Sequence, residues 1–137
     1  MKIRAGFVSN SSSTSFLIVA KDDLNETDFL ELMGVNKGSP LTKVFRELYE
    51  AVQENCRVKV DFKNTNKRVP PRQWFSGDID RMSAHMLDRI DQAASGGLKV
   101  YYGHLSSDTS TIQCFFCTDS FEVENEKIYF NGLECVW

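Results

Sequence analysis

The sequence contains few of the residues that most often carry out chemistry. The 137-residue chain has only two histidines and four cysteines. Four cysteines are too few for the disulfide scaffold of a small secreted domain, so we expect reduced thiols and a cytoplasmic protein. The chain also lacks a nucleophile elbow and a glycine-rich phosphate loop, and we predict no catalytic residue. These absences favour a binding protein over an enzyme without deciding between them.

Long hydrophobic runs are absent as well. The longest run, Phe16–Ala20, has five residues, whereas a membrane-spanning helix needs about 20. Lys2 and Arg4 precede no apolar region of the ~7–15 residues that a secretion signal requires. The net charge of −3 does not suit a body that lies as a whole on nucleic acid or anionic lipid. We therefore expect no membrane contact.

Apolar periodicity predicts one α+β domain over residues 1–137. Alternating residues predict strands at Ile3–Phe7, at Cys56–Phe62 and repeatedly after Leu98, including one through Ile112. Phe16–Ala20 is apolar on both faces, which is typical of a central strand that is covered on both sides. The strands that follow Leu98 predict a C-terminal β-meander.

Capping residues predict about three helices. They begin after Asn25, after Ser39 and after Asp78, and Gly96-Gly97 ends the third. Asn131-Gly132 is typical of a two-residue hairpin turn. The expected architecture is two-layer, with a mostly antiparallel sheet and helices beside it.

Two segments are predicted to be loops. Ser9–Ser15 is polar and of low complexity, and Lys63–Gln73 carries Pro70-Pro71 without periodicity. The second segment belongs to a basic stretch with six cations against one anion, Asp61. Basic side chains beside an aromatic residue suit a protein partner or single-stranded nucleic acid. The candidate binding residues are Arg57, Lys59, Lys63, Lys67, Arg68, Arg72 and Trp74.

The far end of the chain is acidic. Its carboxylates are Asp119, Glu122, Glu124, Glu126 and Glu134, opposed by Lys127. Opposite charges at separate places on one small chain also suit a homo-oligomer.

The cysteines raise the alternative of a zinc-stabilised module. Cys114 and Cys117 have the spacing of a zinc-binding pair, and Cys135 with His104 or Cys56 would complete four ligands. A regular strand would point Cys114 and Cys117 to opposite faces. We therefore favour core thiols and no cofactor, with zinc as the alternative.

His104 has a second interpretation, because it lies in a predicted loop at the end of a strand. It could serve as a base for Cys114 or Cys117, but no motif supports this pairing. His85 lies at the edge of an apolar helix stripe and is interpreted as structural.

The serine-rich segment carries a resemblance. Gly6-Phe7-Val8-Ser9-Asn10-Ser11-Ser12-Ser13-Thr14-Ser15-Phe16 resembles the opening of a loose group of small bacterial and phage-encoded proteins, which have serine at the position of Thr14. The group has no known activity. The resemblance implies a bacterial or phage source and a role, of unknown kind, for Ser9, Asn10, Ser11, Ser12 and Ser13.

Taken together, these patterns predict a small cytoplasmic protein that binds another macromolecule, most simply a protein. The alternatives are a zinc-stabilised module and a single-stranded nucleic-acid binder that uses the region Arg57–Phe75.

Overall fold

The described part of the chain contains helices and five strands, with three of the strands at its C-terminal end. The computed structural model describes residues 13–36, 38–106, 112–113 and 121–136, without the side chains of residues 13 and 133–136. The described elements are β1 (Ser13–Ala20), α1 (Glu26–Leu32), α2 (Thr42–Glu54), β2 (Cys56–Asp61), the 3-10 helices η1 (Pro71–Phe75) and η2 (Ile79–Arg81), α3 (Ala84–Gly96), β3 (Lys99–Ser106), β4 (Phe121–Glu124) and β5 (Ile128–Val136).

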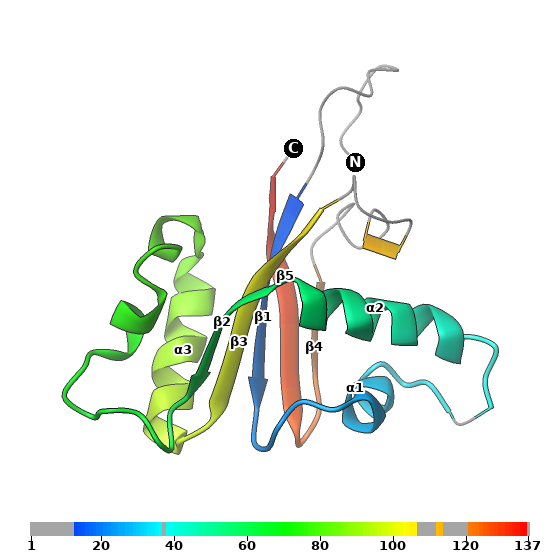
Figure 1. Ribbon diagram of the computed structural model, residues 1–137, viewed down its shortest axis with the longest axis horizontal. Coiled ribbons are helices and arrows are strands. Elements are labelled where there is room, and N and C mark those ends of the chain that lie inside the picture. The colour runs from blue at the N-terminus through cyan, green and yellow to red at the C-terminus, as the bar shows by residue number, and fades with distance from the viewer. Residues whose placement is uncertain (1–12, 37, 107–111, 114–120, 137) are drawn as a thin grey trace.

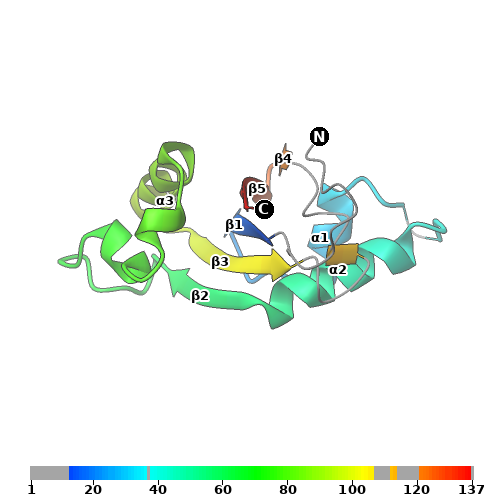
Figure 2. The ribbon, with the colours of Figure 1, turned by 90° about the horizontal axis from the view of Figure 1, so that it is seen from above.

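The strands form one antiparallel sheet in the order β2-β3-β1-β5-β4. Helices cover both faces of this sheet, with α1 and α2 on one side and α3 on the other (Figures 1 and 2). The predicted α+β class with about three helices and an antiparallel sheet is therefore confirmed. The expected number of layers differs, because the sheet is the middle layer of three.

Strand β1 lies at the centre because its residues are apolar on both faces. Phe16, Ile18 and Ala20 pack against α1 and α2. Leu17 and Val19 pack against α3 and the 3-10 helices. Two hydrophobic cores thus share one central strand, as the run Phe16–Ala20 predicts.

Side-chain caps mark the starts of α1 and α3, whereas α2 begins at Thr42 after Leu41, later than the predicted start after Ser39 and without a side-chain cap. The Asn25 side chain accepts the backbone N–H of Asp28 at 2.8 Å and starts α1. Helix α3 starts at Ser83, whose hydroxyl accepts the N–H of Met86 at 3.1 Å. The predicted start after Asp78 is therefore early, because Asp78 precedes η2 instead. Gly97 ends α3 with a φ of 65°, as Gly96-Gly97 predicts.

The C-terminal strands differ from the expected meander. In sequence β4 and β5 form a hairpin, but β1 lies between β5 and β3. The prediction of a turn at Asn131-Gly132 is wrong, since both residues pair inside the sheet. Asn125 makes the turn, because its side-chain oxygen accepts the N–H groups of Lys127 and Ile128, each at 2.9 Å.

Other boundaries also shift. Ser13–Ser15 belong to β1 rather than to a loop, and Ile112 is helical rather than extended. Residues 63–70 contain no helix or strand, as predicted, before η1 begins at Pro71. The strand predicted at Ile3–Phe7 lies outside the described residues.

Candidate functional site

The structure tests little of the zinc interpretation. Cys114 and Cys117 lie outside the described residues, and Cys135 is described only by its backbone in β5. Cys56 is half-buried and its thiol donates to the carbonyl oxygen of Val58 at 3.4 Å. Burial raises the pKa of this thiol, so it behaves as a core residue. In the described part of the chain, no group of three or more histidine, cysteine or acidic side chains is placed so that it could hold a metal ion.

The basic stretch is divided by internal contacts. The Arg72 guanidinium lies 2.8 Å from Asp91 and 3.6 Å from Asp88, both on α3. The hydrogen bond with Asp91 raises the pKa of Arg72. Arg72 is therefore committed to the fold rather than to a ligand.

The hydrophobic anchor of this region is Phe75. Phe75 is fully buried, whereas Trp74 beside it is 39% exposed. The indole of Trp74 is therefore available on the surface, as the binding interpretation requires.

Four of the remaining cations lie along β2 and the segment that follows it, and we call this part of the surface the basic edge (Arg57, Lys59, Lys63 and Lys67). All four are exposed. Lys59 lies over the ring of Tyr101, with 5.4 Å between Nζ and the ring centroid. Lys67 donates to the carbonyl oxygen of Phe62, which holds this side chain at the end of β2. Arg68 is also exposed, within the loop.

Strand β2 lies at one edge of the sheet. Within the described ranges it pairs with β3 alone, and Figure 2 shows its outer side away from all the labelled helices except the adjoining α2. Backbone N–H and C=O groups on such an edge can pair with an added strand. The basic edge thus combines open backbone groups with positive charge.

A second arrangement was not predicted and joins two strands to the residue that precedes η2. Ser15 of β1 faces His104 of β3, and the Ser15 hydroxyl oxygen lies 3.0 Å from Nδ1 of the imidazole. On the other side of the ring, Nε2 lies 3.6 Å from the carboxylate of Asp78. The Tyr102 hydroxyl donates to the Ser15 oxygen at 3.1 Å. We call Ser15, Tyr102, His104 and Asp78 the hydroxyl–imidazole cluster.

The hydrogen bonds of this cluster define a direction. Since Tyr102 donates to Ser15, the Ser15 hydroxyl hydrogen is free to point at Nδ1 of His104. Nδ1 then accepts, and the imidazole hydrogen lies on Nε2. That hydrogen faces the Asp78 carboxylate, which is 4% exposed. The chain of donors therefore runs from Tyr102 through Ser15 to His104, and the Asp78 carboxylate lies just beyond hydrogen-bond reach of Nε2, at 3.6 Å.

Two irregularities in strand pairing lie next to the hydroxyl–imidazole cluster. The β2–β3 register shifts between Cys56 and Val58, and the β1–β5 register shifts between Ser15 and Leu17. Such bulges re-aim side chains. Arg57, at the first bulge, points its guanidinium to within 3.7 Å of Asp78. The cluster therefore reaches the basic edge through Arg57.

Burial sets the protonation of the imidazole. It lowers the pKa of His104, and the positive charges of Arg57 and Arg81 act in the same direction, while Asp78 opposes them. His104 is consequently neutral at neutral pH. The Asp78 Oδ1 and His104 Nε2 atoms are both buried and lack a hydrogen-bond partner among the described residues.

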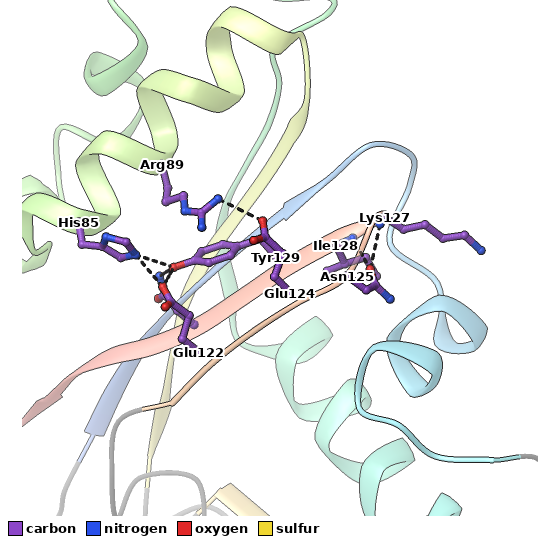
Figure 3. A network of polar contacts seen from close by, with 9 residues as sticks. His85, Arg89, Glu122, Glu124, Asn125, Lys127, Ile128 and Tyr129 are labelled. Atoms are coloured by element: carbon purple, nitrogen blue, oxygen red, sulfur yellow. Dashed lines mark hydrogen bonds and ion pairs between the residues drawn. The ribbon is translucent and has the colours of Figure 1, made fainter.

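A third polar group joins α3 to the C-terminal hairpin (Figure 3). His85 Nε2 lies 2.6 Å from the Glu122 carboxylate and 3.0 Å from the Tyr129 hydroxyl. Arg89 pairs with Glu124 at 3.1 Å and lies 3.8 Å from the centroid of the Tyr129 ring. Burial raises the pKa of Tyr129 to about 12. These contacts hold the edge strand β4 to α3, which agrees with the structural interpretation of His85.

The predicted site residues are thus only partly brought together. Ser9, Asn10, Ser11 and Ser12 lie outside the described residues, and only the backbone of Ser13 is described. His104 is in a strand and pairs with a serine, while the cysteines proposed as its partners are not described. The alternation of residues along β1 could have singled out one member of this cluster, Ser15, but not the others. Ser15 shares a face with Leu17 and Val19, so it is a polar residue on a buried strand face.

Comparisons with protein-family models, curated proteins and solved structures find no match for this chain. In the described residues, no helix is both long and apolar enough to cross a membrane. The function is therefore inferred from the surfaces and side chains described above.

Proposed function

We propose that the protein is an interaction module that binds an extended, acidic segment of another protein along the basic edge. The observation that carries this proposal is the open outer side of β2, flanked by exposed cations. A bound segment would add a sixth strand to the sheet, since backbone hydrogen bonds supply affinity in this mode of recognition. Its carboxylates would meet Arg57, Lys59, Lys63 and Lys67.

The distribution of charge favours a protein over nucleic acid. Single-stranded nucleic acid needs a continuous positive groove along its phosphates. Here the exposed carboxylates of Asp88 and Asp91 on α3 lie beside Arg72. Acidic side chains therefore interrupt the positive surface, whereas a strand partner needs only the edge itself. Trp74 supplies an exposed aromatic contact on η1, which packs near β2.

The test uses a defined probe. A labelled peptide of about ten residues that alternates glutamate and valine is titrated with the full chain, and its fluorescence anisotropy is recorded. We expect binding that weakens as salt rises from roughly 50 to 200 mM. Methylation of the backbone nitrogens at every second residue of the peptide should abolish binding, because it removes the donors to β2. A lysine–valine peptide should not bind.

Matched variants locate the surface. Lys59→Glu together with Lys63→Glu should weaken the peptide about tenfold or more, since two attractive contacts become repulsive. Lys43→Glu is the control, because Lys43 is equally exposed but lies on α2. An equal loss of peptide affinity in the double variant and in Lys43→Glu would contradict the proposal. Binding that survives methylation of the peptide would contradict it as well. Binding of a single-stranded oligonucleotide with a steep salt dependence, without peptide binding, would favour the nucleic-acid alternative.

A further inference from the structure

We propose that Ser15 is a reactive nucleophile, activated by His104 and Asp78, that takes an acyl group from a small ester. The inference goes beyond the proposed binding function and does not depend on it. It rests on the geometry of the hydroxyl–imidazole cluster, in which a hydroxyl, an imidazole and a buried carboxylate follow one another in order.

The distances suit an activated serine. A nucleophile and its base lie within hydrogen-bond reach, and a third group orients the base. Ser15 and His104 are 3.0 Å apart. Asp78 and His104 are 3.6 Å apart, and such contacts are often long before substrate binds.

The protonation state also suits this role. Since Nδ1 of His104 accepts the hydrogen bond of Ser15, it is the nitrogen that can take the hydroxyl proton. The imidazole is neutral at neutral pH, so this nitrogen is free to accept. The Tyr102 hydroxyl already donates to the same serine oxygen, which fixes the orientation of the Ser15 side chain.

Two buried atoms remain unexplained by the fold alone. Nε2 of His104 and Oδ1 of Asp78 have no hydrogen-bond partner among the described residues. Leaving buried polar atoms unpaired costs stability, and such atoms in a native protein often mark a functional site. An imidazolium would pair with the carboxylate across this gap, so the charged intermediate of the reaction satisfies both atoms.

The reaction conserves atoms and charge. The Ser15 oxygen attacks the carbonyl carbon of the ester while its proton passes to Nδ1 of His104. The carbon–oxygen bond to the alcohol then breaks, and the alcohol leaves with the proton that His104 returns. An acyl-serine remains. Ser15 is 5% exposed, so we propose an ester with a small acyl group.

The test is covalent labelling of the full chain by a small fluorophosphonate, read by intact mass and peptide mapping. Attack by Ser15 releases fluoride and leaves one phosphonyl group on its oxygen. We expect one adduct per chain, on Ser15. The labelling rate should rise with pH as His104 loses its proton, with a midpoint below about 6.5, the ordinary pKa of histidine.

Variants distinguish activation of Ser15 by His104 from simple access of the reagent to the Ser15 hydroxyl. His104→Asn keeps a polar side chain but removes the base, and should slow labelling about a hundredfold or more. Ser15→Ala should abolish the adduct. Ser95→Ala is the control, since Ser95 lies exposed on α3 and its loss should change nothing. Circular dichroism of each variant checks that it folds.

The results that overturn the proposal are specific. The first is the absence of any adduct on the wild-type protein after prolonged exposure to the fluorophosphonate. An adduct on another residue, or a folded His104→Asn variant that labels at the wild-type rate, would also show that the cluster serves the fold alone.

Discussion

The Ser15 hydroxyl oxygen lies 3.0 Å from Nδ1 of His104, although the two residues are 89 positions apart in the chain. Antiparallel pairing of β1 with β3 places them directly opposite each other. They share the sheet face that packs against α3, where Tyr102, Leu17 and Val19 form the core. Ser15 and His104 are therefore a polar pair on the same sheet face as a hydrophobic core. The protonation of His104 consequently affects the stability of the fold.

The first prediction concerns acid. The folded state holds the proton of His104 less tightly than the unfolded chain does, because burial lowers its pKa. The stability contributed by neutral His104 is therefore complete above the unfolded pKa of about 6.5 and is lost as pH falls below it.

Urea unfolding at about pH 7.5 and about pH 5.5 measures this loss. The wild-type protein should be less stable at the lower pH. His104→Gln does not titrate, so its change between the two values should be smaller than that of the wild type. An equal change in the wild type and in His104→Gln would assign the effect to groups other than His104.

The second prediction concerns Tyr129. Its pKa is raised to about 12 by burial, so the folded state keeps the phenol neutral. Its contribution to stability is present below the ordinary tyrosine value of about 10 and is lost as pH rises from there towards 12. Tyrosinate absorbance after a rapid pH jump should show a phase near pH 12. Tyr129→Phe should remove that phase and leave those of the other tyrosines, and its persistence would contradict the assignment.

The parts of the fold that could be predicted follow from local sequence patterns, such as apolar runs and helix-ending glycines. Phe16–Ala20 is central because it is apolar on both faces, and α3 ends where Gly97 adopts a left-handed conformation. The prediction of a turn at Asn131-Gly132 is wrong because of contacts that the local sequence does not show. Asn131 donates to the Tyr129 hydroxyl at 2.7 Å, and Gly132 lies under the ring of Phe121. Both residues therefore serve packing inside the sheet rather than a turn.

The hydroxyl–imidazole cluster could not be predicted from spacing. Its members come from two strands and from the residue before η2, so no fixed interval in the sequence relates them. Each member taken alone has an ordinary interpretation, such as a capping aspartate for Asp78. The positive charge of the basic edge was easier to predict, because its cations lie close together in the sequence, on β2 and directly after it. Even so, the sequence did not show that Arg72 is paired with α3.

The third prediction concerns the close approach of α2 to β3. A Cβ atom on Gly103 would overlap the backbone carbonyl oxygen of Asn55 and lie 2.8 Å from the ring of Phe16. Backbone atoms cannot move aside cheaply, so Gly103→Ala should destabilise the protein by about 3 kcal/mol or more.

Gly77→Ala is the matched control for this change. A Cβ atom on Gly77 meets no described atom within 4 Å, so the expected effect is within about 0.5 kcal/mol. Thermal unfolding of both variants measures the difference. Similar midpoints for the two proteins would show that α2 and β3 are less closely packed than the structure has them.

The last prediction concerns the start of α3, which carries His85 and Arg89 towards the C-terminal hairpin. Ser83 accepts the N–H of Met86, and loss of such a cap costs about 1 kcal/mol. Ser83→Ala should therefore lower the free energy of unfolding by that amount, whereas Ser95→Ala, near the other end of the same helix, should change it less. If the helix instead began after Asp78, Ser83 would be an interior position and alanine there would stabilise the helix. The sign of the change in the free energy of unfolding, measured in urea, thus distinguishes a helix that starts after Ser83 from one that starts after Asp78.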